Sequence, residues 1–110
     1  MRKSLILAAV GVALLMSGPA PIAAQEAVGV DIRDFSFVPK DLMVRVSTAV
    51  RWVNRDDAPH RIVMDGGRPG SSGTLGQGAE HTFTFTEAGR FPYHCGIHPT
   101  MLGEVNVTGP

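Results

Sequence analysis

The residues best suited to carry chemistry lie in one short segment near the C-terminal end. Cys95, the only cysteine among the 110 residues, is followed by His98 three positions later and by Met101 three positions after that. Thiolate, imidazole and thioether are ligands that copper accepts in both of its oxidation states. A second imidazole would complete the set, and His60, which follows Pro59, is well placed to supply it. These four side chains predict a mononuclear copper site with two imidazoles, one thiolate and a weak axial sulfur, whose chemistry would be one-electron transfer.

Each of these residues also has an ordinary structural interpretation. An isolated cysteine is often a small buried hydrophobe, and a methionine usually packs in a core. His98 alone would be a surface loop histidine, and His60 lies 35 positions before Cys95, so its spacing constrains it least. The three-residue intervals from Cys95 to Met101 favour the metal site.

The first residues have the pattern of an export signal. Met1–Lys3 is basic, residues 5–16 are apolar, and Ala23 and Ala24 offer a cleavage site. This pattern predicts a signal peptide over residues 1–24, a mature domain over residues 25–110 and a periplasmic location. The apolar run is shorter than the ~20 residues of a spanning helix, so we expect no membrane span after removal. A retained N-terminal anchor is the alternative.

The mature chain would be one small domain with 110 − 24 = 86 residues. A single cysteine cannot form an internal disulfide, and a bound metal would both protect the thiol and add stability. Removing Arg2 and Lys3 leaves eight basic against ten acidic residues. The sequence has no block of basic residues of the kind that would suggest binding to nucleic acid.

Alternating patterns predict short strands, and no segment has a helical period. The expected strands cover residues 28–33, 35–37, 42–47, 50–55, 60–64, 81–86, 90–95 and 103–107. Residues 65–78 are rich in Gly, Ser and Pro, which indicates a long irregular loop. Seven or eight strands without helices predict an all-β fold, an antiparallel sandwich or a small barrel.

The parity of the strand at 90–95 separates two histidine environments. Phe91, Tyr93 and Cys95 share one face, whereas His94 lies on the other. We therefore expect His94 to point away from the thiol, with a structural or surface role. His81 begins a strand in phase with phenylalanines, and we expect an edge histidine there.

The segment Tyr93-His94-Cys95-x-x-His98-Pro99-x-Met101, preceded by Thr84-Phe85-Thr86-Glu87-Ala88-Gly89, resembles the plastocyanin/azurin family of cupredoxins, and most closely the amicyanin subfamily. Arg51-Trp52-Val53-Asn54 before Pro59-His60 is similar to the strand that carries that family's first ligand. The resemblance implies a Greek-key β-sandwich and a type 1 copper centre. It also implies His60, Cys95 and His98 as equatorial ligands and Met101 as the axial ligand.

Two positions depart from that family's pattern. Arg61 stands where an asparagine commonly ties the two ligand loops together. Ile97 stands where amicyanins tend to have proline, and it keeps a backbone N–H that could donate to the Cys95 sulfur.

The expected function is that of a periplasmic electron carrier, monomeric and not an enzyme, working between a redox protein donor and acceptor such as a dehydrogenase, a cytochrome or a reductase. A copper chaperone or storage protein is the alternative. A metal-free immunoglobulin-like module is disfavoured because the second cysteine of its disulfide is absent. Zinc also fits a His₂Cys set but lacks redox chemistry.

Overall fold

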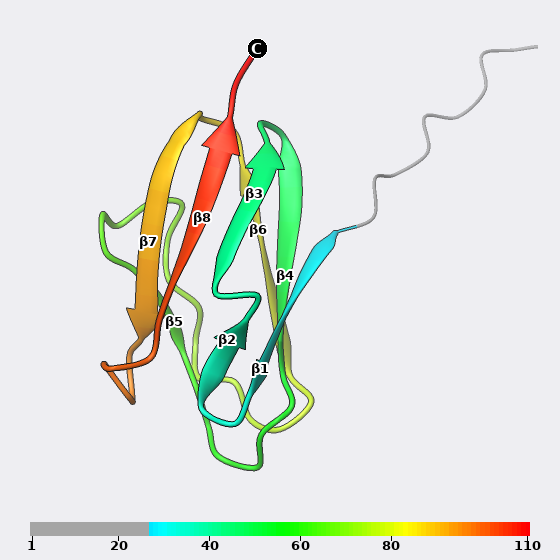
Figure 1. Ribbon diagram of the computed structural model, residues 1–110. Helices are drawn as coiled ribbons and strands as arrows, with labels where there is room; N and C mark the ends of the chain where they lie inside the picture. The colour runs from blue at the N-terminus through cyan, green and yellow to red at the C-terminus, as the bar shows by residue number, and fades with distance from the viewer. Residues whose placement is uncertain (1–26) are drawn as a thin grey trace, which may run out of the picture.

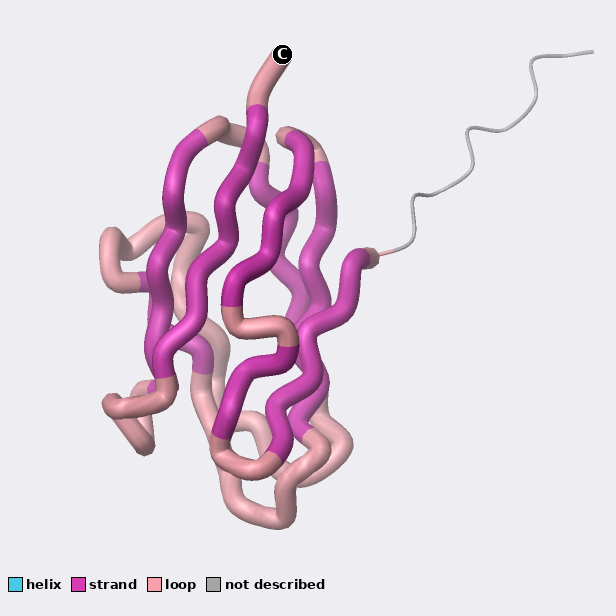
Figure 2. Tube along the Cα trace, in the orientation of Figure 1, coloured by secondary structure: helices cyan, strands magenta, loops and turns pink. Residues whose placement is uncertain are grey.

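The structure is a computed structural model that describes residues 27–110, so the signal-peptide prediction lies outside the described residues. Eight strands form two layers (Figures 1 and 2). Their bounds are Val28–Arg33 (β1), Ser36–Val38 (β2), Asp41–Arg45 (β3), Thr48–Asn54 (β4), Ile62–Met64 (β5), Glu80–Phe85 (β6), Gly89–Cys95 (β7) and Leu102–Thr108 (β8). Within this described part, the chain has no helix with the length and apolarity that a membrane crossing needs.

The prediction of an all-β sandwich is confirmed. One sheet has the strand order β2-β1-β4-β6, and the other has the order β3-β8-β7-β5. Each sheet contains one parallel pair, β1 with β4 and β3 with β8, while the remaining pairs are antiparallel. The expected antiparallel pairing is therefore wrong for these two pairs, which join strands that are distant in sequence.

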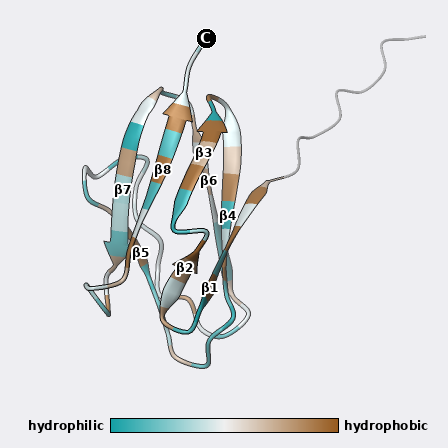
Figure 3. Cartoon of the chain, viewed as in Figure 1, coloured by the Kyte–Doolittle hydropathy of each residue, from teal (hydrophilic) through white to brown (hydrophobic). Residues whose placement is uncertain are grey.

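The core lies between the two sheets, because alternate residues of each strand point inward. Along β4, Val50, Trp52 and Asn54 are fully buried, as their alternation predicts. Figure 3 shows the same alternation as bands of hydrophobic and hydrophilic colour along β8. The apolar core consists of Val30, Ile32, Phe37, Val44, Val50, Trp52, Ile62, Met64, Leu75, Phe83, Phe85, Tyr93, Cys95, Met101, Val105 and Val107.

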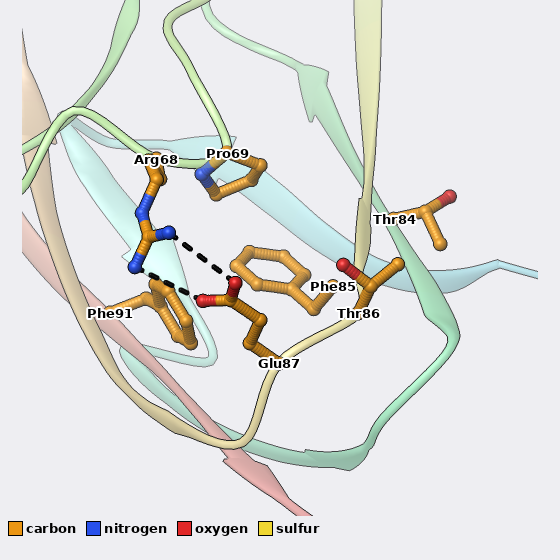
Figure 4. Close-up of a pocket in the computed structure, with 7 residues that line it drawn as sticks. All are labelled: Arg68, Pro69, Thr84, Phe85, Thr86, Glu87 and Phe91. Carbon is orange, nitrogen blue, oxygen red and sulfur yellow. Dashed lines mark hydrogen bonds and ion pairs between the residues drawn. The ribbon is translucent and has the colours of Figure 1, made fainter.

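The long connection between β5 and β6 is fastened to the sandwich at several points. Leu75 is buried in the core, and the hydroxyl of Ser72 accepts a hydrogen bond of 2.8 Å from the Ile62 backbone N–H. Figure 4 shows a second attachment, where Arg68 pairs with Glu87 at 3.0 Å beside the phenyl ring of Phe91. This loop is thus an ordered part of the domain, and its inner segment supports the residues around His60.

Candidate metal centre

Three of the four predicted ligands meet at one end of the sandwich. The ligand atoms of His60, Cys95 and His98 all lie within 4.8 Å of one another. The Cys95 Sγ atom lies 3.6 Å from His60 Nδ1 and 3.8 Å from His98 Nδ1. Bonds of about 2.3 Å to sulfur and about 2.0 Å to nitrogen, at about 120°, would separate these atoms by about 3.7 Å. The three side chains therefore fit around one first-row metal ion.

Two strands bring the first histidine to the cysteine. Cys95 is the last residue of β7 and pairs with Ile62 at the start of β5. His60 lies two residues before β5 and exchanges two backbone hydrogen bonds with Leu75, of 3.1 and 2.7 Å. His60 and Cys95 are both fully buried. Backbone pairing with Leu75 thus fixes the position of His60.

The loop that carries His98 and Met101 is closed by its own backbone. The Cys95 N–H donates to the Met101 carbonyl at 3.0 Å, and the Met101 N–H donates to the His98 carbonyl at 2.9 Å. Met101 is 5% exposed and belongs to the core cluster. These bonds keep the three-residue spacing of the motif compact. The role of Met101 as axial ligand stays a prediction.

The Cys95 sulfur receives a backbone hydrogen bond from Arg61. The Arg61 N–H lies 3.4 Å from Sγ, and the Arg61 carbonyl accepts from the Gly96 N–H at 2.9 Å. These two contacts join the first-ligand segment to the cysteine loop without an asparagine side chain. Among the described residues, Arg61 is the backbone donor that the structure gives to this sulfur, whereas Ile97 is 40% exposed.

Asp56 orients His60 from the side opposite the metal position. Its carboxylate lies 2.8 Å from His60 Nε2 and accepts from the N–H groups of Asp34 and Phe35, at 2.7 and 3.0 Å. Burial opposes ionisation, but the hydrogen bonds from Phe35, His60 and Asp34 outweigh it and lower the pKa of Asp56. With Nε2 held by a carboxylate, Nδ1 of His60 is the nitrogen left to face a metal.

Phe35 covers both imidazoles. Its ring meets that of His60 edge-on at a centroid distance of 5.4 Å and that of His98 at 5.1 Å. Asp34 and Phe35 have φ angles of 52° and 54°, a left-handed conformation that is costly for residues other than glycine. The two hydrogen bonds to Asp56 hold this turn in place. Phe35 is 51% exposed, so it forms part of the surface above the histidines.

Sequence reasoning missed the roles of Asp56 and Phe35, and it assigned no role to Asn54. Asn54 donates to the carbonyls of Ala58 and Leu75, both at 2.9 Å, and so shapes the turn that leads to His60. Its place on the inward face of β4, beside Val50 and Trp52, was the one signal that could have identified a buried polar residue.

The other two histidines lie as predicted. The Nδ1 atom of His94 is 2.7 Å from a carboxylate oxygen of Asp65, on the outer face of β7. His81 lies on β6, an edge strand, and packs edge-on against Phe83 at 4.4 Å. Neither belongs to the cluster formed by His60, Cys95 and His98.

The donor set therefore suits copper. One thiolate and two imidazoles in a buried, backbone-fixed arrangement match copper's ligand preferences in both oxidation states. Because His60 and Cys95 are packed in the protein interior, their side chains have little freedom to rearrange.

Comparisons with known proteins agree with this site. Residues 6–107 match the sequence model of the cupredoxin-like domain. The chain is 37% identical to amicyanin of Paracoccus denitrificans and 30% identical to amicyanin of Paracoccus versutus, in each case over 79% of this chain and 72% of the relative. A solved structure of a variant amicyanin in its Cu(I) form superposes with a TM-score of 0.72 at 36% identity, covering 78% of this chain and 86% of that one.

Proposed function

The chain belongs to the cupredoxin family, and from this premise we propose that it carries single electrons on one copper ion. In this proposal His60, Cys95 and His98 are the equatorial ligands and Met101 is the axial one. The bound ion would supply a one-electron Cu(I)/Cu(II) couple. The observation that carries the proposal is the approach of the three ligand atoms within 4.8 Å at one end of the β-sandwich.

The residues around the cluster divide the work of the site. Asp56 holds the ring of His60, and the backbone of Arg61 donates to the Cys95 sulfur. Phe35 keeps water from one side of both imidazoles. His98 is only half-buried and lies on the outer loop, so its ring is the natural entry point for an electron.

The proposal extends to the setting in which the protein works. Similarity to amicyanin supports a periplasmic carrier that exchanges electrons with larger redox proteins, such as a dehydrogenase, a cytochrome or a reductase. We further propose that residues 1–24 are removed as a signal peptide, that residues 25–110 act as a monomer, and that the protein is not itself an enzyme.

A copper chaperone or storage protein is the second candidate. Such a role needs ligands from which copper exchanges readily. The full burial of His60 and Cys95 favours the carrier instead, because buried ligands release a metal slowly. Retention of copper through repeated reduction and oxidation supports the carrier, whereas loss of copper on reduction supports the chaperone.

The decisive variant is Cys95→Ser. We expect the copper-loaded wild type to be intensely blue, since a thiolate–copper bond absorbs visible light strongly, and we expect the variant to lose this band because a hydroxyl cannot replace the thiolate. Optical spectra of both proteins loaded with Cu(II) make the measurement. The matched control is His94→Ala, which removes a histidine adjacent to the cysteine but outside the cluster. A colourless wild type, or colour that survives in Cys95→Ser, would contradict the assignment.

A further inference from the structure

Arg61 places its side chain across the cysteine loop at Gly96. A methyl group added to Gly96 would lie 2.5 Å from Arg61 Nε, 2.7 Å from Nη2 and 2.9 Å from a methyl of Val63, closer than such contacts allow. The glycine therefore leaves the space that the guanidinium occupies. This contact adds to the two hydrogen bonds that the Arg61 backbone makes with the Cys95 sulfur and with the Gly96 N–H.

The charge of this guanidinium is not neutralised by a carboxylate in the part of the chain that the structure describes. Five other arginines there form ion pairs with acidic residues, namely Arg33, Arg51, Arg55, Arg68 and Arg90. The Arg61 Nε atom, in contrast, is buried without a hydrogen-bond partner. A partly buried charge acts on its neighbours more strongly than one in water, because less solvent screens it.

We propose that Arg61 raises the reduction potential of the centre and that Gly96 is the residue that lets it do so; the inference rests on the proposed copper site. Oxidation of the bound ion from Cu(I) to Cu(II) releases one electron to the accepting redox protein and leaves one more positive charge beside Cys95. The fixed charge of Arg61 opposes that increase, so it stabilises the reduced centre relative to the oxidised one. No proton needs to move in this step.

The contact itself can be tested on the metal-free protein. A buried Nε–H should exchange slowly with solvent, so its ¹H–¹⁵N signal should persist where that of an exposed arginine is lost. Arg45, at the end of β3 and without an ion pair in the described residues, is the reference. In Gly96→Ala the guanidinium should be displaced, and the Arg61 signal should then exchange as fast as that of Arg45. Equally fast exchange of both signals in the wild type would overturn the placement.

The effect on potential is measured by voltammetry of the copper-loaded proteins. We expect Arg61→Gln to shift the redox equilibrium toward the oxidised form by threefold to tenfold, and tenfold corresponds to about 59 mV for one electron. Arg61→Lys keeps the charge, so its reduction potential should stay close to that of the wild type. Arg45→Gln removes the same charge at the far end of β3 and should leave the potential unchanged.

Two outcomes separate this inference from the proposed function. If the wild type shows no thiolate–copper band and no one-electron couple, the copper proposal itself fails. If the wild type is blue but Arg61→Gln has the same potential as Arg45→Gln, only the role of Arg61 is refuted. Should Arg61→Gln disturb the visible band, Gly96→Ala decides. Introduced alone, Gly96→Ala should lower the reduction potential. Added to Arg61→Gln, it should cause no further decrease. Additive effects of the two substitutions would refute the coupling.

Discussion

At the scale of single residues, the least direct assignment is that of Met101. Its burial and its place at the closing hydrogen bonds of the loop fit an axial ligand, but they also fit simple packing. We expect Met101→Leu to keep the blue band and to raise the reduction potential, because the loss of a thioether destabilises Cu(II) more than Cu(I). Voltammetry at one pH compares the two proteins. The same substitution at Met64, a buried methionine of β5, is the packing control, and equal potentials for all three proteins would assign Met101 to the core alone.

Asp56 is a residue whose loss should be felt without any metal. Its carboxylate is 12% exposed and accepts from two backbone N–H groups as well as contacting His60. In Asp56→Asn the side-chain amide offers one acceptor atom instead of two. The substitution also removes the negative charge, and hydrogen bonds to a charged group contribute more to stability than those between neutral groups. We expect the free energy of unfolding of the metal-free protein to fall by about 2 kcal/mol.

Urea unfolding of the metal-free protein measures this change. The control is Asp57→Asn, the same substitution at the exposed adjacent residue, for which the expected change is close to zero. Equal stability of Asp56→Asn and Asp57→Asn would show that the turn at Asp34 and Phe35 does not depend on the carboxylate.

At the scale of the strands, the close packing of one cross-strand pair can be tested by replacing a glycine with alanine. Gly103 of β8 faces Tyr93 of β7, and a methyl group at Gly103 would overlap the tyrosine ring. Overpacking of this kind costs about 1–3 kcal/mol, so Gly103→Ala should lower the thermal unfolding midpoint. Gly29→Ala on β1 meets nothing within 4 Å and should leave the midpoint nearly unchanged. Equal midpoints for the two variants would mean that Tyr93 moves aside without cost.

The strands could be predicted from sequence because their signal is local. Burial on one face imposes the alternation, and β4 shows it from Val50 to Asn54. The parallel pairing of β1 with β4 depends on how distant strands meet, and alternation carries no information about that. The same limit applies to the site. Cys95 and His98 are linked by short spacing, whereas the contacts of Asp56 with Asp34 and Phe35 span more than 20 positions and leave no local pattern.

At the scale of the whole molecule, metal and fold should stabilise each other. The ligands come from two segments that meet only in the folded chain, so an ion that binds them favours the folded state. We expect copper at a thousandfold excess over its dissociation constant to add about 4 kcal/mol to the free energy of unfolding.

Calorimetry with and without a chelator measures this stabilisation. Cys95→Ser should show little dependence of its unfolding midpoint on copper, because one of the strongest ligands is missing. A wild-type midpoint that does not respond to copper would indicate that the metal binds the unfolded chain as well as the folded one.

The two ends of β8 lie at opposite poles of the domain. The strand leaves the ligand loop at Leu102 and ends at Thr108, close to the C-terminus (Figure 1). Seven residues of strand span about 20 Å. A protein immobilised on an electrode through a C-terminal tag would therefore present His98 and Phe35 to the solution and keep its attachment point away from them. Soluble redox proteins could then approach that face as freely as they approach it on the unattached molecule.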